Sequence, residues 1–224
     1  MKKLYYWSDK NIISKIKNSL SNDQVIITST DTVMGFLANI NKKSFEKLTR
    51  LKGQRENKPF LIITNSIDKL YKFVDKKNLE HQKIKKLIEK HWPGPLTLIF
   101  KAKENLPTFL ISKEKTIAIR IPKHKGLQRV LENFEGLFST SANKTNKPTP
   151  KHYNDLDPEV LKNVKFVVTK EENIDTKNKI YKILPSTIID VSKIKSTYDK
   201  VKIVRKGEYP IEELEETYGS KFKK

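Results

Sequence analysis

Hydroxyl and amide side chains are concentrated in one stretch of the chain, residues 137–150. An apolar start, Leu137-Phe138, is followed there by Ser139-Thr140-Ser141-Ala142-Asn143 and then by a segment containing two prolines. This pattern is typical of a buried strand that ends in a hydrogen-bonding loop, although the same residue types also form ordinary turns. The stretch alone therefore leaves a binding loop and a structural turn open.

Three other strand-like runs lead directly into polar residues. Val25-Ile26-Ile27 precedes Thr28-Ser29-Thr30-Asp31-Thr32, Ile117-Ala118-Ile119 precedes Arg120, and Leu184-Pro185 precedes Ser186-Thr187. Strand ends that carry hydroxyls and a guanidinium commonly meet at one edge of an open α/β sheet, where ligands bind. The repeated pattern favours one shared polar site over several unrelated turns.

The rare arginines support the same interpretation. The chain has a formal net charge of +20 from 46 Lys and Arg residues, of which five are arginine. Lysine is spread over almost every segment, which leaves open whether the charge is a solvated surface or a nucleic-acid-binding face. Arginine offers a flat, bidentate donor that lysine lacks. Arg55, Arg120 and Arg205 lie beside the polar stretches, so we interpret them as candidate anion-binding residues.

The elements that would position these residues follow from hydrophobic periodicity. The patterns predict helices and strands that alternate without a linker, which indicates one α/β domain. Residues 171–182 are lysine-rich and polar, and we expect a mobile loop there. The expected helices are 9–20, 41–52, 66–74, 78–90, 126–133, 157–162 and a charged tail from 211, and the expected strands are 25–27, 34–38, 60–64, 96–100, 116–121, 164–169, 186–191 and 201–205.

Composition excludes several classes of site. The chain has no cysteine, and its four histidines show no zinc-ligand spacing, so we expect no metal held by protein side chains. It contains neither an apolar run of about 18 residues nor a signal peptide at its start, which predicts a cytoplasmic protein.

The known nucleophile and phosphate-loop motifs are also missing. The sequence contains no Gly-x-Ser-x-Gly elbow, which disfavours covalent serine catalysis, and no glycine-rich phosphate loop. What remains is an inventory of hydroxyls, an amide, arginines and lysines. Such groups suit the placement of an anion and the stabilisation of charge on a phosphoryl group.

Seven short motifs follow one another along the chain. They are Thr30-Asp31-Thr32-Val33-Met34-Gly35, Lys52-Gly53-Gln54-Arg55 with Lys58-Pro59-Phe60, Trp92-Pro93-Gly94-Pro95-Leu96-Thr97, Ala118-Ile119-Arg120-Ile121-Pro122, Ser139-Thr140-Ser141-Ala142-Asn143, Pro185-Ser186-Thr187-Ile188 and Val204-Arg205-Lys206-Gly207. Each motif alone is weakly specific, whereas seven in order are a strong signal. In their order and over roughly residues 8 to 210, the chain resembles the YrdC-like family of threonylcarbamoyl-AMP synthases.

The resemblance implies a fold and an activity. It implies a twisted, open, mixed α/β sheet with flanking helices around a basic concave cavity, in the short, single-domain form, with a catalytic domain over 1–210 and a helical tail over 211–224. It implies an L-threonylcarbamoyladenylate synthase, a nucleotidyltransferase that joins L-threonine, bicarbonate or CO2, and ATP with Mg2+, and releases pyrophosphate. Downstream enzymes would transfer the threonylcarbamoyl group to adenosine 37 of tRNAs, giving the t6A modification.

The resemblance also implies roles for individual residues. For L-threonine these are Thr32, Arg120, Ser141 and Ser186. For ATP they are Lys52, Arg55, Lys58, Thr116, Asn143 and Arg205. The expected catalytic residues are Lys52, Arg55, Ser141 and Asn143.

Two other functions remain to be weighed against the synthase. A non-catalytic module could hold double-stranded RNA or tRNA in a basic cavity through phosphate contacts, and tRNA contact is open for the synthase as well. Carbamoyl transfer in hydrogenase maturation uses a related domain, but within a much longer chain with cysteine-rich modules. The absence of cysteine here argues against that last role.

Overall fold

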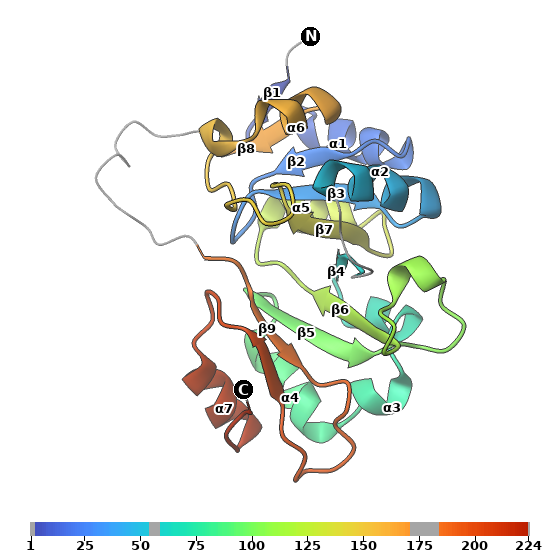
Figure 1. Ribbon diagram of the computed structural model, residues 1–224, viewed down its shortest axis with the longest axis vertical. Coiled ribbons are helices and arrows are strands. Elements are labelled where there is room, and N and C mark those ends of the chain that lie inside the picture. The colour runs from blue at the N-terminus through green and yellow to red at the C-terminus, as the bar shows by residue number, and fades with distance from the viewer. Residues whose placement is uncertain (1–2, 54–58, 171–183, 224) are drawn as a thin grey trace. The chain divides into compact units, whose positions relative to one another are not determined.

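The computed structural model describes residues 3–53, 59–170 and 184–223 as a mixture of strands and helices (Figure 1). The chain divides into two compact units. The first consists of the described parts of residues 1–55 and 124–184, and the second of those of residues 56–123 and 185–224. Each unit is therefore built from two separate stretches of the sequence.

The described strands of the first unit pair in the order β1-β8-β2-β3-β7. β8 pairs parallel with β1 and β2, whereas β3 pairs antiparallel with β2 and β7. The strands are β1 (Leu4–Tyr6), β2 (Ile26–Thr28), β3 (Gly35–Asn39), β7 (Leu137–Ser141) and β8 (Val167–Thr169). The helices are α1 (Ile12–Ser21), α2 (Lys42–Lys52), α5 (Lys125–Leu131), the 3-10 helix η3 (Tyr153–Asp155) and α6 (Pro158–Asn163).

Helical periodicity explains how α1 packs in the first unit. Ile12, Ile16 and Leu20 recur every four residues and are buried, which places them on one face of the helix. That helix contacts β2, β3 and α5. At about 1.5–3 kcal/mol for each fully buried aliphatic side chain, this stripe is a main contribution to the core of the unit.

The described strands of the second unit pair in the order β4-β6-β5-β9-β10. The β4–β6 and β5–β9 pairs are parallel, and the β5–β6 and β9–β10 pairs are antiparallel. The strands are β4 (Leu61–Ile63), β5 (Leu96–Lys101), β6 (Thr116–Arg120), β9 (Thr187–Asp190) and β10 (Lys202–Arg205). The helices are η1 (Asp68–Lys72), α3 (Lys76–Leu79), α4 (Gln82–His91), η2 (Thr108–Leu110) and α7 (Ile211–Tyr218).

Helix α7 packs against α4 within the second unit. It buries Ile211, Leu214 and Tyr218. His91, the last residue of α4, shares hydrogen bonds with two side chains of the 209–217 region: its Nδ1 lies 2.6 Å from the Tyr209 hydroxyl and its Nε2 lies 2.8 Å from Thr217 Oγ1. The C-terminal helix is thus attached to the unit by both apolar and polar contacts, while the boundary expected at residue 210 stays a prediction.

The mixed α/β architecture with flanking helices is confirmed, with local differences. The helix expected over 78–90 is divided into α3 and α4, because Asp75 caps the first through the Asn78 amide and His81 adopts an extended conformation. The segment expected as a helix over 66–74 forms only the short 3-10 helix η1. Strand β1 was not expected. No helix among the described residues is long and apolar enough to cross a membrane.

Candidate functional site

Lys52 is the centre of a polar cluster in the first unit. Residues Ser44, Leu48 and Lys52 follow each other at intervals of four on α2 and form its buried face. The helix then ends at Gly53, whose φ of 74° is a conformation that glycine adopts readily. The lysine is therefore the last residue of a buried stripe, and only 4% of its surface is exposed.

The ammonium group of Lys52 is held by the end of β7 and the loop after it. Its Nζ donates to the carbonyl oxygens of Ser141 (3.0 Å) and Asn143 (2.5 Å) and to Asn143 Oδ1 (3.0 Å). The Ser141 hydroxyl donates to the same Oδ1 at 2.6 Å, and the Asn143 amide group donates to the Lys147 carbonyl. A lysine ammonium has three donors, and this loop supplies three oxygens that accept from it. These three oxygens therefore fix the position of the Lys52 ammonium.

Thr32 lies on a turn that is joined to the same loop. The Thr30 hydroxyl donates to the Val33 carbonyl at 2.8 Å and accepts from the Thr32 amide at 3.0 Å. The Met34 carbonyl accepts from the amide of Ala142 at 2.9 Å, between Ser141 and Asn143. Three predicted residues of the first unit, Lys52, Ser141 and Asn143, are therefore brought together. Thr32 lies two residues before Met34, whose carbonyl binds the same loop.

A second cluster forms in the second unit at the ends of β6, β9 and β10. Arg120, the last residue of β6, is only 5% exposed, and its Nε donates to the Gly94 carbonyl at 2.9 Å. Arg205 donates from Nε and Nη2 to the Ser186 carbonyl at 3.0 and 2.8 Å, and from Nη2 to the Ser186 hydroxyl at 3.1 Å. Arg205 as a whole is exposed, but desolvation of its guanidinium by the groups around it, and then the positive charge of Arg120, lower its pKa.

Thr97 and Gly207 complete this second cluster. The Thr97 hydroxyl lies 2.8 Å from the Ser186 hydroxyl, and both residues are buried. A Cβ at Gly207 would lie 2.2 Å from the Pro185 carbonyl oxygen, so only glycine permits the chain to pass Ser186 this closely. No role was assigned to either residue from the sequence. The signal for Thr97 was a hydroxyl inside the apolar run Leu96-Thr97-Leu98.

Thr116 lies apart from the second cluster. It is the first residue of β6 and Arg120 is the last, so the two are separated by four strand positions, or about 13 Å along the strand. Its hydroxyl lies 2.8 Å from the Ser112 hydroxyl. Two further candidates, Arg55 and Lys58, lie outside the described residues, as does the expected loop over 171–182.

The two clusters consist of cations, hydroxyls and one amide, a donor set that suits an anion. Among residues 3–53, 59–170 and 184–223, no three His, Asp or Glu side chains form a group that could hold a metal ion. The expectation that both clusters belong to one pocket stays a prediction.

Comparisons with known proteins identify the family of this chain. The family described as Telomere recombination, Sua5/YciO/YrdC, matches residues 18–207. A relative from Methanocaldococcus jannaschii, named as a putative threonylcarbamoyl-AMP synthase, is 33% identical over 206 residues, which cover 92% of this chain and 90% of the relative.

Two solved structures share the fold. Sua5 of P. abyssi, determined in complex with L-threonine, has a TM-score of 0.75 at 21% identity and matches 99% of this chain. This chain spans 62% of that Sua5 chain. YciO of E. coli has a TM-score of 0.73 at 21% identity and matches 96% of this chain and 100% of its own. From the family match over residues 18–207 and the 33% identity to the M. jannaschii relative, the chain belongs to the Sua5/YciO/YrdC family.

Proposed function

We propose that this protein is an L-threonylcarbamoyladenylate synthase that supplies the t6A modification of tRNA. The family and the printed name of the M. jannaschii relative support the activity, and the P. abyssi Sua5 complex supports threonine as a ligand. The observation that carries the proposal is the buried Lys52 ammonium, which is held by the Ser141–Asn143 loop through three oxygens. A buried cation of this kind suits a reaction in which negative charge develops on phosphate.

The reaction class is nucleotidyl transfer. The threonine nitrogen forms a bond to the carbon of CO2 and loses a proton, or to the carbon of bicarbonate with loss of water, and the N-carboxylated amino acid results. An oxygen of this carbamate then forms a bond to the α-phosphorus of ATP. The bond from the α-phosphorus to the bridging oxygen breaks, and pyrophosphate leaves with that electron pair. Positioning and charge stabilisation suffice for this step. Mg2+ is expected to enter bound to the phosphate oxygens of ATP, because hard cations prefer oxygen ligands.

The main role of the first cluster is to hold its side chains in fixed positions for the substrates. Because its three donors are directed to loop oxygens, Lys52 fixes Asn143 and supplies positive charge, and it contacts a phosphate only if one of those bonds is exchanged. The Ser141 hydroxyl, which donates to Asn143, keeps lone pairs that can accept a hydrogen bond from threonine. Thr32 adds a second hydroxyl for the amino acid.

The second cluster binds carboxylate and phosphate through its guanidinium groups. Arg120 has the planar fork that matches the threonine carboxylate, with Ser186 as a neutral partner. Arg205 binds ATP phosphates, together with Arg55 and Lys58. Thr116 lies at the opposite end of β6 from Arg120, so its expected contact with ATP is a separate one. The effect of Arg120 on the pKa of Arg205 supports an anion at this place, since a bound anion would offset the mutual repulsion of two cations.

Mass spectrometry tests the activity directly. Incubation of the purified chain with L-threonine, bicarbonate and Mg-ATP should yield threonylcarbamoyl-AMP, and pyrophosphate release should require both threonine and bicarbonate. Arg120→Ala and Asn143→Ala should abolish the product while thermal unfolding stays cooperative. Arg129→Ala, at an exposed residue on α5, is the control and should retain the rate of the parent.

Two outcomes would contradict the proposal. An unchanged rate in both Arg120→Ala and Asn143→Ala would mean that the site is wrong. Salt-sensitive RNA binding without turnover would instead favour the non-catalytic module.

A further inference from the structure

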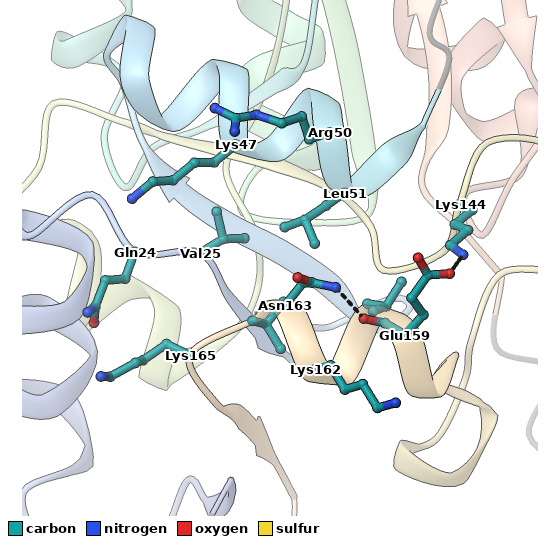
Figure 2. Close-up of a pocket in the computed structure, with 12 residues that line it drawn as sticks. Gln24, Val25, Lys47, Arg50, Leu51, Lys144, Glu159, Lys162, Asn163 and Lys165 are labelled. Atoms are coloured by element: carbon teal, nitrogen blue, oxygen red, sulfur yellow. Dashed lines mark hydrogen bonds and ion pairs between the residues drawn. The ribbon is translucent and has the colours of Figure 1, made fainter.

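A pocket of about 530 Å³ opens in the first unit between α2 and α6 (Figure 2). Val25, Val160 and Val164 are buried residues of its lining, and Leu51 projects from the last turn of α2. The pocket therefore has an aliphatic floor. Its volume lies within the range of about 300–1,000 Å³ that is usual for small-molecule sites.

The rim of this pocket is strongly positive. Five of its residues are cationic and one is acidic; the cations are Lys47, Arg50, Lys144, Lys162 and Lys165, and the acid is Glu159. Figure 2 shows these side chains arranged around Val25 and Leu51, with Lys47 and Lys165 extending toward the same side of the view.

Two of the five cations already have partners. Lys144 is paired with Glu159 and lies 3.5 Å from Asp157, and Lys47 donates to the Asp23 carbonyl at 2.8 Å. Within the described parts of the chain, the charged groups of Arg50, Lys162 and Lys165 make no ion pair. The pocket thus keeps positive charge that its own acidic residue does not neutralise.

Arg50 is informative because arginine is rare in this chain. Five arginines occur among 46 basic residues, and Arg50 is exposed at the pocket rim, one position before the floor residue Leu51. A guanidinium binds the oxygens of a phosphate in a bidentate manner, which a lysine ammonium cannot do. An arginine beside two lysines and an aliphatic floor is suited to a ligand with one apolar part and one phosphate.

The pocket is separate from the proposed catalytic groups. Its lining includes none of Thr32, Lys52, Ser141 and Asn143. It does share chain segments with that cluster, since Leu51 precedes Lys52 and Lys144 follows Asn143. The Thr145 amide and hydroxyl also donate to the Lys52 carbonyl at 2.8 and 2.9 Å, which links the two segments.

We propose that this pocket is a second nucleotide site that binds a free nucleoside phosphate. The base packs on Val25, Val160 and Val164, and the phosphate is bound by Arg50 and the neighbouring lysines. Inorganic phosphate would leave the aliphatic floor uncovered. An RNA backbone is recognised along an extended track of cations, whereas this site is bounded by α2 and α6. Both ligands serve as comparisons in the test.

Titration of the full chain with AMP, followed by amide NMR and calorimetry, tests the proposal. AMP should shift the amide resonances of residues 47–51 and 159–165, and inorganic phosphate should bind there at least about tenfold more weakly. Arg50→Glu combined with Lys165→Glu should weaken AMP binding at this site by at least about tenfold, because two attractive charges become repulsive. Arg50→Lys should cause a smaller loss, since the charge remains and only the bidentate geometry is removed.

A matched control separates local charge from total charge. Lys85→Glu with Lys86→Glu makes the same charge change on exposed residues of α4 in the second unit, and it should leave AMP binding at the pocket unchanged. The proposal is overturned if both double variants lose AMP binding equally, if inorganic phosphate binds as tightly as AMP, or if only an oligoribonucleotide shifts these amides.

Discussion

The two polar clusters hold their cations in different ways. In the first unit a single lysine is buried, and three oxygens of one loop accept its hydrogen bonds. In the second unit two arginines lie near each other, and the charge of Arg120 contributes to the lowered pKa of Arg205. The lysine is stabilised by the protein itself, whereas the arginine pair retains repulsion that an anion can offset.

This difference indicates that Lys52 contributes to the stability of the fold, whereas Arg120 and Arg205 contribute mainly to ligand binding. Lys52 connects α2 to the loop after β7, so its loss affects both the structure and the site. Arg205 bonds to Ser186 from strand β10 at the edge of the sheet order in its unit. Replacement of the lysine and of the arginine should therefore have different consequences for stability.

The largest effect on stability and activity is expected from substitution of Lys52. Lys52→Met keeps the length of the side chain but leaves the carbonyls of Ser141 and Asn143 without their donor. We expect a loss of about 1–3 kcal/mol in the free energy of unfolding, measured by urea denaturation, and loss of threonylcarbamoyl-AMP formation. Lys42→Met, at the exposed start of the same helix, should change neither quantity.

The comparison itself is tested by Arg205→Gln. This variant removes repulsion with Arg120 together with the bonds to Ser186, so its unfolding free energy should fall by less than that of Lys52→Met while synthesis still decreases. An equal or larger loss of stability at Arg205 would contradict the distinction between the two clusters.

Much of the first cluster could be predicted from the sequence, because its residues belong to patterns formed by neighbouring positions in the chain. The glycine at position 53 predicts where α2 ends, and the hydroxyl run marks the end of a strand. The sequence predicted Phe45, Leu48 and Leu51 as the inward face of this helix, whereas the structure buries Ser44, Leu48 and Lys52. The structure shifts one boundary, since β7 continues through Ser141 and includes hydroxyls that were expected in the loop.

The second cluster was harder to predict from the sequence, because it depends on pairing between strands that are far apart in the chain. Thr97 and Ser186 are 89 positions apart and become neighbours only through the parallel pairing of β5 with β9. No local pattern specifies that register. The separation of Thr116 from Arg120 likewise follows only once both are placed on the same strand.

A smaller effect is expected at Thr97. Thr97→Val keeps the shape of the side chain and removes the hydroxyl that lies 2.8 Å from the Ser186 hydroxyl. We expect a loss of about 0.5–1.5 kcal/mol in stability and a severalfold increase in KM for threonine, because Ser186 loses a fixed orientation. Steady-state kinetics with varied threonine measure this change.

The matched control for Thr97 is a buried threonine of the first unit. Thr28 is also 0% exposed, and its hydroxyl has no hydrogen-bond partner within the described structure. Thr28→Val should therefore be neutral or stabilising, because it removes an unsatisfied polar group. Equal destabilisation by the two substitutions would show that the Thr97–Ser186 contact has no special role.

The smallest expected effect is a pH dependence of stability, which arises where α4 contacts α7 in the second unit. Burial, and then the positive charge of Lys90, lower the pKa of His91, so the folded state favours the neutral imidazole. In the unfolded chain the pKa returns to about 6.5, and between the two values the unfolded state binds more protons. Stability should therefore fall slightly as the pH decreases below about 7, and level off below the folded pKa. Urea denaturation at pH 7.5 and 5.5 measures this loss, and His91→Gln should show less of it; equal acid sensitivity in both proteins would remove His91 from the explanation.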